Sequence, residues 1–294
     1  MKCECQQITK LQPDFCVLLN QYRLIEISGA DAEKYLQGQL TADVTKLAIG
    51  EHTLTSHCDP KGKMSALFRL YRAQAEQFFA IIRCELLPEA LVQLKKYAVF
   101  SKVTFTELDT PLFGVANATT LANLSENATA LVLSCAQKRA IVWGETLTTH
   151  GESALWDLAD IQDGLPILAK ANQFELIPQA ANLQAVENAI SFTKGCYIGQ
   201  ETVARAKYRG ANKRAMFILV GNSEQAECPE AGQALEMQLG ENWRASGTVL
   251  AAVHYQQQLW VQIVLNKEIE ADTLFRFNDM LLKICELPYA LEEA

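Results

Sequence analysis

The alternation of apolar and polar residues in the first third of the chain predicts strands joined by short turns and interrupted by two helices. Apolar residues at a spacing of four after Asp31 predict a helix capped by that residue, and helical spacing after Pro88 predicts a second helix. A Pro and a Gly at residues 59–63 are typical of a tight turn between two strands. The predicted strands fall at residues 22–27, 53–58, 64–71, 78–82 and 102–108.

A second series of strands with a helix follows, and the pattern then changes. The helix begins near Glu152 and ends at Gly164 and Pro166. Beyond Gly210 only short strands separated by Gly, Pro and polar turns remain, which predicts a small barrel or sandwich. The predicted strands of these two regions are 112–116, 131–135 and 140–143, and then 216–220, 248–253, 260–264 and 274–277.

Composition and charge describe an ordinary globular protein. The 294 residues are 49% hydrophobic and 20% charged, and the net charge of -8 disfavours wholesale coating of nucleic acid or of an anionic membrane. Nine scattered cysteines and a start without an apolar leader predict a cytoplasmic location, and the apolar runs fall far short of the ~20 residues of a membrane helix. No metal site is expected, and we interpret Cys3 and Cys5 as solvated terminal thiols.

The segment KGCYIGQET at residues 194–202 carries the most distinctive chemistry, because the chain has no phosphate-binding loop, dinucleotide fingerprint or serine-hydrolase elbow. It joins a predicted strand at residues 190–192 to a predicted helix at residues 202–206, which places Cys196 in the turn. The glycines, Lys194 and the helix N-terminus favour a reactive thiolate there. The alternative interpretation is a small buried thiol in a glycine-rich turn.

Positive charge is concentrated in the same part of the chain. Six basic residues and one acidic residue, Glu201, give residues 194–214 a local charge of about +5, which would attract a carboxylate tail or phosphates. The alternative interpretation is a solvated basic helix face. The basic residues are Lys194, Arg205, Lys207, Arg209, Lys213 and Arg214.

Several segments in a fixed order carry a resemblance to a known family. The longest is KGCYIGQETVARAKYRGANKR, beginning at residue 194. The others are ISGADAEKYLQGQLTADV (27–44), CDPKGKM (58–64), LKKYAVFSKVT (94–104), IPQAANLQAV (177–186) and GENWRASGTVLAAV (240–253). Together they resemble the YgfZ family, folate-binding proteins implicated in tRNA modification and in maintaining iron–sulfur enzymes, over nearly the whole chain.

The resemblance implies an α+β fold of three domains in a ring around a central folate cavity, as in the glycine-cleavage T-protein, an aminomethyltransferase that uses tetrahydrofolate. Two ferredoxin-like α/β units and a small C-terminal β-barrel are expected. With the strand pattern above, the first unit is assigned to residues 1–50 with 110–200, the second to residues 51–109, and the barrel to residues 201–294.

The resemblance also implies site residues. Cys196 takes the place of the family's important thiol, and Tyr22 and Trp156 fall at two aromatic positions that contact folate, although one family member has Trp at the first. From the residues alone, both aromatics would be assigned to the core. Gln162 replaces a family glutamate, so the charge-assisted contact with the pterin would weaken or pass to Asp163. Gln162 and Asp163 are both assigned to folate binding. The glutamate tail of folate is assigned to the basic residues Lys194, Arg205, Lys207 and Arg209.

Three functions stay open at this point. The first is a folate-binding accessory protein that supports tRNA modification through iron–sulfur enzymes. The second is a folate-dependent one-carbon transferase with Cys196 as nucleophile and His57 or Asp59 as proton-transfer partner, but residues 64–68 read MSALF where the T-protein carries its paired aspartates, so chemistry of that kind looks lost. The third is a direct RNA-binding module that uses the basic segment.

Overall fold

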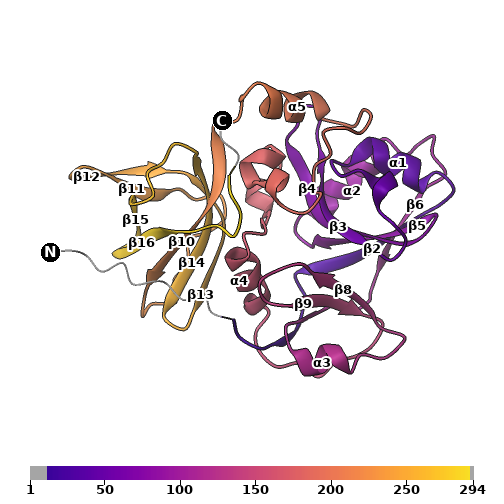
Figure 1. Cartoon of the computed structure of the whole chain (residues 1–294), viewed down its shortest axis with the longest axis horizontal. Coiled ribbons are helices and arrows are strands. Elements are labelled where there is room, and N and C mark those ends of the chain that lie inside the picture. Colours follow the sequence, from indigo (N-terminus) through magenta and orange to yellow (C-terminus); the bar gives the residue numbers. More distant parts are fainter. Residues whose placement is uncertain (1–11, 292–294) are drawn as a thin grey trace.

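The computed structural model describes residues 12–291 and arranges their strands in three antiparallel sheets (Figure 1). Cys3 and Cys5 lie outside the described residues. The smallest sheet has the order β1-β7-β9-β8. Its strands are β1 (Cys16–Leu18), β7 (Phe113–Val115), β8 (Thr129–Leu133) and β9 (Arg139–Trp143). Helix α3 (Ala118–Ala122) follows β7, and Asn117 caps it by accepting a hydrogen bond from the Thr120 amide at 2.8 Å.

The middle sheet has five strands in the order β3-β4-β5-β2-β6. The strands are β2 (Tyr22–Ser28), β3 (His52–Cys58), β4 (Met64–Gln74), β5 (Gln77–Arg83) and β6 (Thr104–Leu108), with helices α1 (Ala32–Gln39) and α2 (Leu87–Lys96) in the same region. The tight turn between β3 and β4 forms as predicted. Asp31 stands at the N-cap of α1 but makes no side-chain cap bond, because its carboxylate accepts the Lys102 amide at 2.8 Å instead.

The sheets group the strands differently from the predicted domain division. That division placed residues 22–28 with residues 110–200, whereas β2 pairs with β5 and β6 of the middle sheet. The domain bounds themselves stay a prediction. The strand grouping could not be found locally, because pairing partners 49 or more residues apart leave no signal in a periodic pattern.

The C-terminal sheet has seven strands in the order β12-β11-β15-β16-β10-β14-β13 and curls around an apolar core of its own (Figure 1). Val261 and Phe275 are among the side chains that fill this core and are fully buried. The strands are β10 (Arg214–Asn222), β11 (Leu235–Leu239), β12 (Asn242–Ser246), β13 (Thr248–Tyr255), β14 (Gln258–Asn266), β15 (Leu274–Phe277) and β16 (Met280–Cys285).

Helix α4 (Ala154–Gln162) lies between the C-terminal sheet and the other two sheets (Figure 1). Seven of its nine residues are buried, as expected for a helix that packs on more than one side. The segment after α4 is fixed to the barrel by Gln262 of β14, which accepts the Ile167 amide at 3.0 Å and donates to the Leu165 carbonyl at 2.6 Å. The end of α4 therefore has a defined position relative to the barrel.

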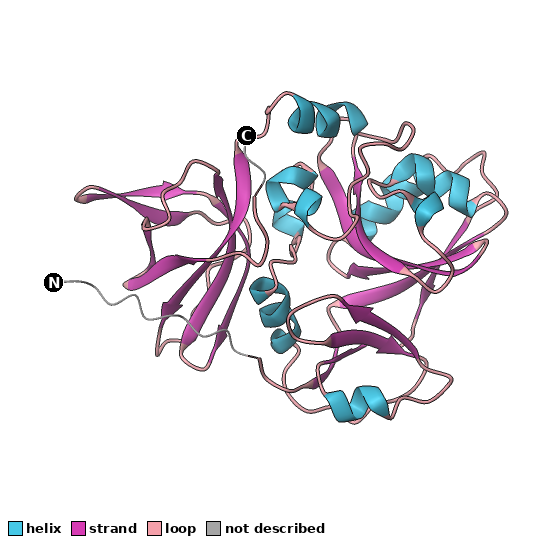
Figure 2. Cartoon of the chain, in the orientation of Figure 1, coloured by secondary structure: helices cyan, strands magenta, loops and turns pink. Residues whose placement is uncertain are grey.

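The connection from α4 to the barrel consists of short helical turns and irregular chain (Figure 2). It contains the 3₁₀ turns η2 (Lys170–Asn172), η3 (Pro178–Ala181) and η4 (Leu183–Ala185), and ends in α5 (Gln200–Tyr208); η1 (Val44–Lys46) lies earlier in the chain. The predicted strand at residues 190–192 is wrong, because this segment is irregular and joins no ladder. Among the helices of residues 12–291, none combines the length and hydropathy that crossing a bilayer requires.

Candidate functional site

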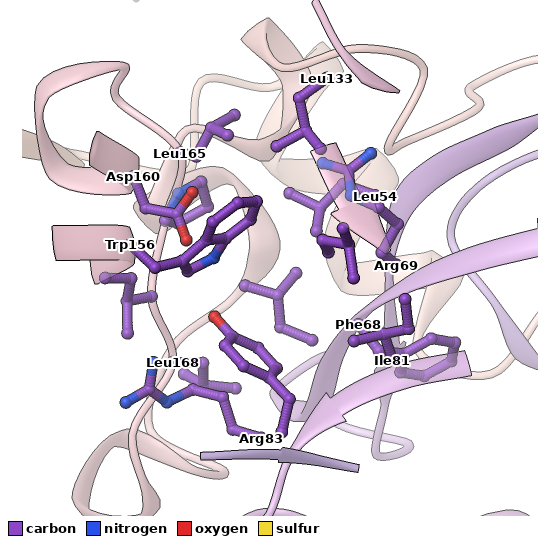
Figure 3. Close-up of a pocket in the computed structure, with 15 residues that line it drawn as sticks. Leu54, Phe68, Arg69, Ile81, Arg83, Leu133, Trp156, Asp160, Leu165 and Leu168 are labelled. Carbon is purple, nitrogen blue, oxygen red and sulfur yellow. The ribbon is translucent and has the colours of Figure 1, made fainter. Parts of the chain in front are cut away.

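A cavity of about 50 Å³ lies where α4 and the segment after it meet the faces of the middle and small sheets. Figure 3 shows Trp156 and Asp160 on one side of this cavity and Arg69 on the other. Most of the remaining wall is aliphatic, so the few polar groups stand out. The lining residues that matter for its chemistry are Tyr22, Arg69, Arg83, Trp156 and Asp160.

Trp156 is held rigidly by its surroundings on α4. Its exposed fraction is 1%, and its ring and that of Phe15 pack in a T-shaped arrangement with a centroid distance of 6.4 Å. Gly114 of β7 makes room for it, since a Cβ at that position would lie 2.5 Å from Trp156 Cε3. The Arg139 guanidinium carbon lies 4.5 Å from the ring centroid, a distance typical of a cation–π contact. The indole therefore offers a fixed aromatic surface to the cavity.

Asp160 is the acidic group of the cavity. It follows Trp156 by four residues in α4, and this spacing places both side chains on one face of the helix. Asp160 Oδ1 lies 2.8 Å from Arg139 Nη2, and the same nitrogen lies 3.1 Å from Asp163 Oδ2. Burial is the largest influence on the carboxyl and raises its pKa to about 6, despite the opposing effect of Arg139.

Tyr22 and Arg83 form the wall contributed by neighbouring strands β2 and β5. The Arg83 guanidinium carbon lies 5.4 Å from the Tyr22 ring centroid. Arg83 is held in turn by Asp157, with Nη1 at 3.0 Å and 3.2 Å from the two carboxylate oxygens. Burial raises the pKa of the Tyr22 hydroxyl, and Asp160 adds to this, so the phenol stays protonated at neutral pH.

Arg69 closes the cavity toward an outer groove of about 830 Å³. Its Nη2 lies 2.8 Å from Glu187 Oε1, its Nη1 lies 3.1 Å from Glu187 Oε2, and the same Nη1 lies 2.9 Å from His52 Nδ1. Glu187 also accepts the Leu54 amide at 2.7 Å and lines the groove together with His52. This bidentate pair separates the inner cavity from the groove.

The structure places Tyr22 and Trp156 on the wall of one cavity, but not the other residues assigned to the pterin, and the contact of both aromatic residues with folate stays a prediction. Gln162 is buried and Asp163 pairs with Arg139; neither lines the cavity. The carboxyl that does line it is Asp160, which the sequence reasoning missed. Its spacing of four from Trp156 was the available signal.

The cations of the site were missed as well. Arg69 interrupts the apolar residues of β4, Arg83 directly follows those of β5 at the end of that strand, and Arg139 is fully buried in β9. A charged residue in an otherwise apolar strand was the signal, because such a residue is seldom buried without a partner.

Cys196 lies in an exposed loop and does not line the cavity. The nearby Lys194 is buried, and its Nζ donates to the carbonyls of Leu40 at 2.8 Å and Ala42 at 2.7 Å. Burial lowers the pKa of this ammonium to about 8. Lys194 therefore fixes the loop to the end of α1, and its predicted roles toward Cys196 and toward a folate tail stay predictions.

The predicted tail-binding residues of α5 also lie outside the cavity lining. Arg205 is exposed and pairs with Glu201 at 2.7 Å, and Lys207 Nζ lies 5.3 Å from the Phe192 ring centroid. Arg209 is exposed at the end of the helix. Figure 1 places α5 at the outer edge of the molecule. Their contact with a ligand tail stays a prediction.

The two proton-transfer partners considered for Cys196 are engaged elsewhere. His57 is fully buried, its Nδ1 meets Ser65 Oγ, and burial lowers its pKa to about 4. Asp59 Oδ1 accepts the amides of Lys61 at 2.9 Å and Lys63 at 2.8 Å, which is the hydrogen-bond pattern of an Asx-type turn. Both residues have structural roles in the β3–β4 hairpin.

The fold and the sequence agree on the class of protein. The chain has a fold similar to that of the glycine cleavage system aminomethyltransferase T from Bartonella henselae, with a TM-score of 0.67 and 12% identity over 94% of this chain and 87% of that one. Residues 212–280 match the family model described as the YgfZ β-barrel domain. The predicted α+β, T-protein-like fold with a C-terminal barrel is confirmed.

The curated relatives identify the family. An uncharacterized protein of Haemophilus influenzae is 51% identical over 94% of this chain and 99% of its own length. The tRNA-modifying protein YgfZ of an Enterobacter species is 45% identical, covering 94% of each chain, and that of Yersinia pseudotuberculosis is 43% identical, covering 94% of this chain and 93% of its own. The chain belongs to the YgfZ family.

Proposed function

We propose that this protein binds a folate and acts as a cytoplasmic accessory protein in tRNA modification, in support of iron–sulfur enzymes that carry it out. Membership of the YgfZ family and the T-protein-like fold support a role in tRNA modification. The folate part is carried by one observation, which is the cavity where Tyr22 and Trp156 meet the buried carboxyl of Asp160. Exposed Cys196 is the thiol through which the protein acts on a bound one-carbon unit, a sulfur species or a cluster.

The groups of the cavity fit a flat heterocycle with polar edges. Aromatic rings offer stacking faces, Asp160 offers acceptors, and Arg69 and Arg83 offer donors. The volume of about 50 Å³ is well below the ~300–1000 Å³ that encloses a whole drug-sized ligand. The cavity is therefore too small to enclose a whole folate, and the proposal assigns only the edge of the ring to it, with the charged tail outside.

Calorimetric titration with tetrahydrofolate tests this function. We expect saturable binding by the native protein and at least ~10-fold weaker binding by Tyr22→Leu, because a lost stacking contact costs about 1–3 kcal/mol. Tyr71→Leu is the matched control, since Tyr71 is half-buried on the same sheet and packs on Phe79 and Trp143 outside the cavity lining. Absence of binding by the native protein would refute the folate role.

The role of Cys196 is tested separately in cells that lack the gene. A Cys196→Ser protein should fail to restore tRNA modification, whereas Cys84→Ser, whose thiol donates to the Asn20 carbonyl at 3.3 Å, should restore it. Full restoration by folded Cys196→Ser removes the thiol from the function. Multiple turnover of a labelled one-carbon unit by the purified protein would instead favour the transferase alternative.

Direct contact with RNA is a second candidate function, favoured by the surface at the end of α5. Tyr208 is 69% exposed there, and Arg209, Lys213 and Arg214 are exposed beside it in the chain. A basic surface with an exposed aromatic ring is typical of single-strand binding, because the cations meet phosphates and the ring stacks on bases.

Mobility-shift titrations with tRNA at low and moderate salt test this candidate. Replacing Arg209, Lys213 and Arg214 by Gln should abolish a salt-dependent shift, while replacing the exposed Lys95 and Lys96 of α2 by Gln should leave it. The candidate is wrong if the native protein produces no shift at low salt.

A further inference from the structure

Apolar side chains gather on the surface at the end of α2. Of the nine large apolar side chains that are exposed within residues 12–291, four fall in the short stretch 92–100. Single exposed apolar residues are ordinary, whereas a local cluster of them marks an interaction surface. The four residues, called the α2 patch below, are Val92, Tyr97, Val99 (74% exposed) and Phe100 (100% exposed).

The turn that presents Phe100 is fixed by hydrogen bonds on its N-terminal side. The Ser101 amide donates to the Ala98 carbonyl at 2.9 Å and closes the turn. In the last turn of α2, the Leu94 carbonyl accepts a hydrogen bond from the buried Tyr35 hydroxyl of α1. The end of α2 therefore has a fixed position on α1.

The C-terminal side of the turn is fixed as well. The Lys102 amide donates to Asp31 Oδ2 at 2.8 Å, and the Lys102 carbonyl accepts the Asp31 amide at 3.3 Å. Gly29, with a φ of +137°, lets this carbonyl approach, because a Cβ at residue 29 would collide with its oxygen. The chain thus holds an exposed aromatic ring in one position, and such preorganisation lowers the entropy cost of docking.

The charge around the α2 patch is positive. Lys95, Lys96 and Lys102 are exposed, and none of them forms an ion pair within the described part of the chain. Glu89 is the one acidic residue of residues 87–102, which gives this segment a charge of about +2 in a chain of net charge -8. A surface with carboxylates around an apolar pocket would complement it.

A protein partner fits the α2 patch better than a second copy or a bilayer does. Two copies docked through the same surface would bring lysines against lysines. An anionic bilayer would attract these lysines but repel the rest of the acidic chain. On the basis of the proposed function, we propose that the α2 patch docks the tRNA-modifying iron–sulfur enzyme that this protein supports. Phe100 enters an apolar pocket of that enzyme, and carboxylates at the rim of the pocket meet the lysines.

The α2 patch is separate from the cavity of the candidate site. None of its four residues lines the inner cavity or the outer groove. Figure 1 places α1 and α2 on the opposite side of the molecule from the C-terminal sheet. Changes to the patch should therefore leave tetrahydrofolate binding intact, so docking and ligand binding can be measured independently.

Complementation of cells that lack the gene tests the proposal. Val99→Ser/Phe100→Ser should fail to restore tRNA modification, although the purified variant should keep the native urea midpoint and the native affinity for tetrahydrofolate. Leu239→Ser/Leu281→Ser is the matched control, because it removes two exposed apolar side chains from β11 and β16 of the barrel, and it should restore modification. Full restoration by Val99→Ser/Phe100→Ser overturns the proposal.

Photo-crosslinking in cells tests the identity of the partner. The photoreactive p-benzoylphenylalanine in place of Phe100 should form an adduct with a tRNA-modifying iron–sulfur enzyme, and the same group in place of Leu281 should not. The purified enzyme should then bind Val99→Ser/Phe100→Ser at least ~10-fold more weakly than the native chain, as expected for the loss of a central aromatic anchor.

Charge reversal tests the acidic rim and replaces the apolar variant if that variant does not fold. Lys95→Glu/Lys96→Glu should weaken binding of the enzyme, and this effect should shrink as salt is added. Lys138→Glu/Lys283→Glu, on exposed residues of the other two sheets, is the control and should bind like the native chain. Unchanged binding by Lys95→Glu/Lys96→Glu overturns the proposed rim.

The possible failures are distinguishable. An adduct with lipid, with RNA, with a second copy of this chain or with a protein outside tRNA modification overturns the docking proposal, and so does the absence of any adduct. The proposed function survives each of these results if the native chain restores tRNA modification and binds tetrahydrofolate. A native chain that does not restore modification overturns the proposed function itself.

Discussion

Each cation at the cavity is held by a carboxylate from another part of the chain. Arg83 of β5 is held by Asp157 of α4, and Arg69 of β4 by Glu187 in the segment before α5. Such pairs cost desolvation energy, but they fix the direction of the side chains that line the cavity. At the scale of residues, ion pairs thus hold the polar side chains of the cavity in fixed positions beside its aromatic and aliphatic side chains.

His57 makes stability sensitive to mild acid. Its pKa is about 4 in the folded protein, chiefly because of burial, against 6.5 when exposed. As the pH falls below 6.5, the His57 ring becomes protonated in the unfolded chain but stays neutral in the folded one. The free energy of unfolding therefore decreases until the pH reaches the folded pKa of about 4. We expect a loss of up to ~1.4 kcal/mol per pH unit over this window.

Urea unfolding at pH 7 and pH 5 measures this effect. His57→Gln should be less stable than the native protein at pH 7, because the buried ring is lost, but its stability should fall by about 2 kcal/mol less between the two pH values. Equal pH dependence in the two proteins would show that His57 is already charged when folded.

Sequence reasoning at this scale selected Tyr22 and Trp156 through family resemblance and did not select Asp160, although all three line the cavity; their contact with folate stays a prediction. The reason is physical, since Trp156 is 1% exposed and has the contacts of a core residue as well as a place at the cavity. A periodic pattern of apolar residues indicates which side chains are buried, but it does not distinguish a side chain that lines a cavity from one in the hydrophobic core.

At the scale of elements, strand β7 affects the site because it has a glycine, Gly114, where it packs against α4. Gly114 lies against the Trp156 ring, and a Cβ would come within 2.5 Å of Cε3 and 3.0 Å of Leu19 Cδ2. Gly114→Ala must displace the indole, so we expect a loss of about 1–3 kcal/mol in unfolding free energy together with weaker ligand binding.

Gly38→Ala in α1 is the control, because a Cβ there meets no atom within 4 Å and an alanine favours the helix by about 0.5–1 kcal/mol. Urea unfolding and the tryptophan emission spectrum would report the two effects. Native-like stability of Gly114→Ala would mean that the indole moves freely and that the wall is not rigid.

Elements defined by local contacts were the predictable ones. The β3–β4 hairpin was found because its turn lies within residues 59–63. Strand β1 was missed because only three residues pair with β7, and the segment 190–192 was taken for a strand because its apolar residues pack without joining a sheet. Burial alone does not reveal hydrogen-bond partners.

At the scale of the whole molecule, the barrel supports the cavity without lining it. Gln262 of β14 is fully buried and bonds the backbone of residues 165 and 167 in the segment that forms part of the cavity wall. Asn172 donates to the Val249 carbonyl of β13 at 3.2 Å and adds a second polar connection. These long-range bonds could not be predicted, since neither partner has a periodic signature.

Gln262→Leu should therefore affect the cavity from a distance. The change leaves the Ile167 amide and the Leu165 carbonyl buried without partners, each at a cost of about 1–3 kcal/mol, so the unfolding free energy should fall by several kcal/mol. Tetrahydrofolate affinity should fall as well, because residues 165–167 of the cavity wall lose their hydrogen bonds to the barrel.

Gln238→Leu on the half-buried face of β11 is the matched control and should change neither the unfolding free energy nor the affinity for tetrahydrofolate. A Gln262→Leu protein that loses stability but binds tetrahydrofolate normally would show that the barrel stabilises the fold without setting the shape of the cavity.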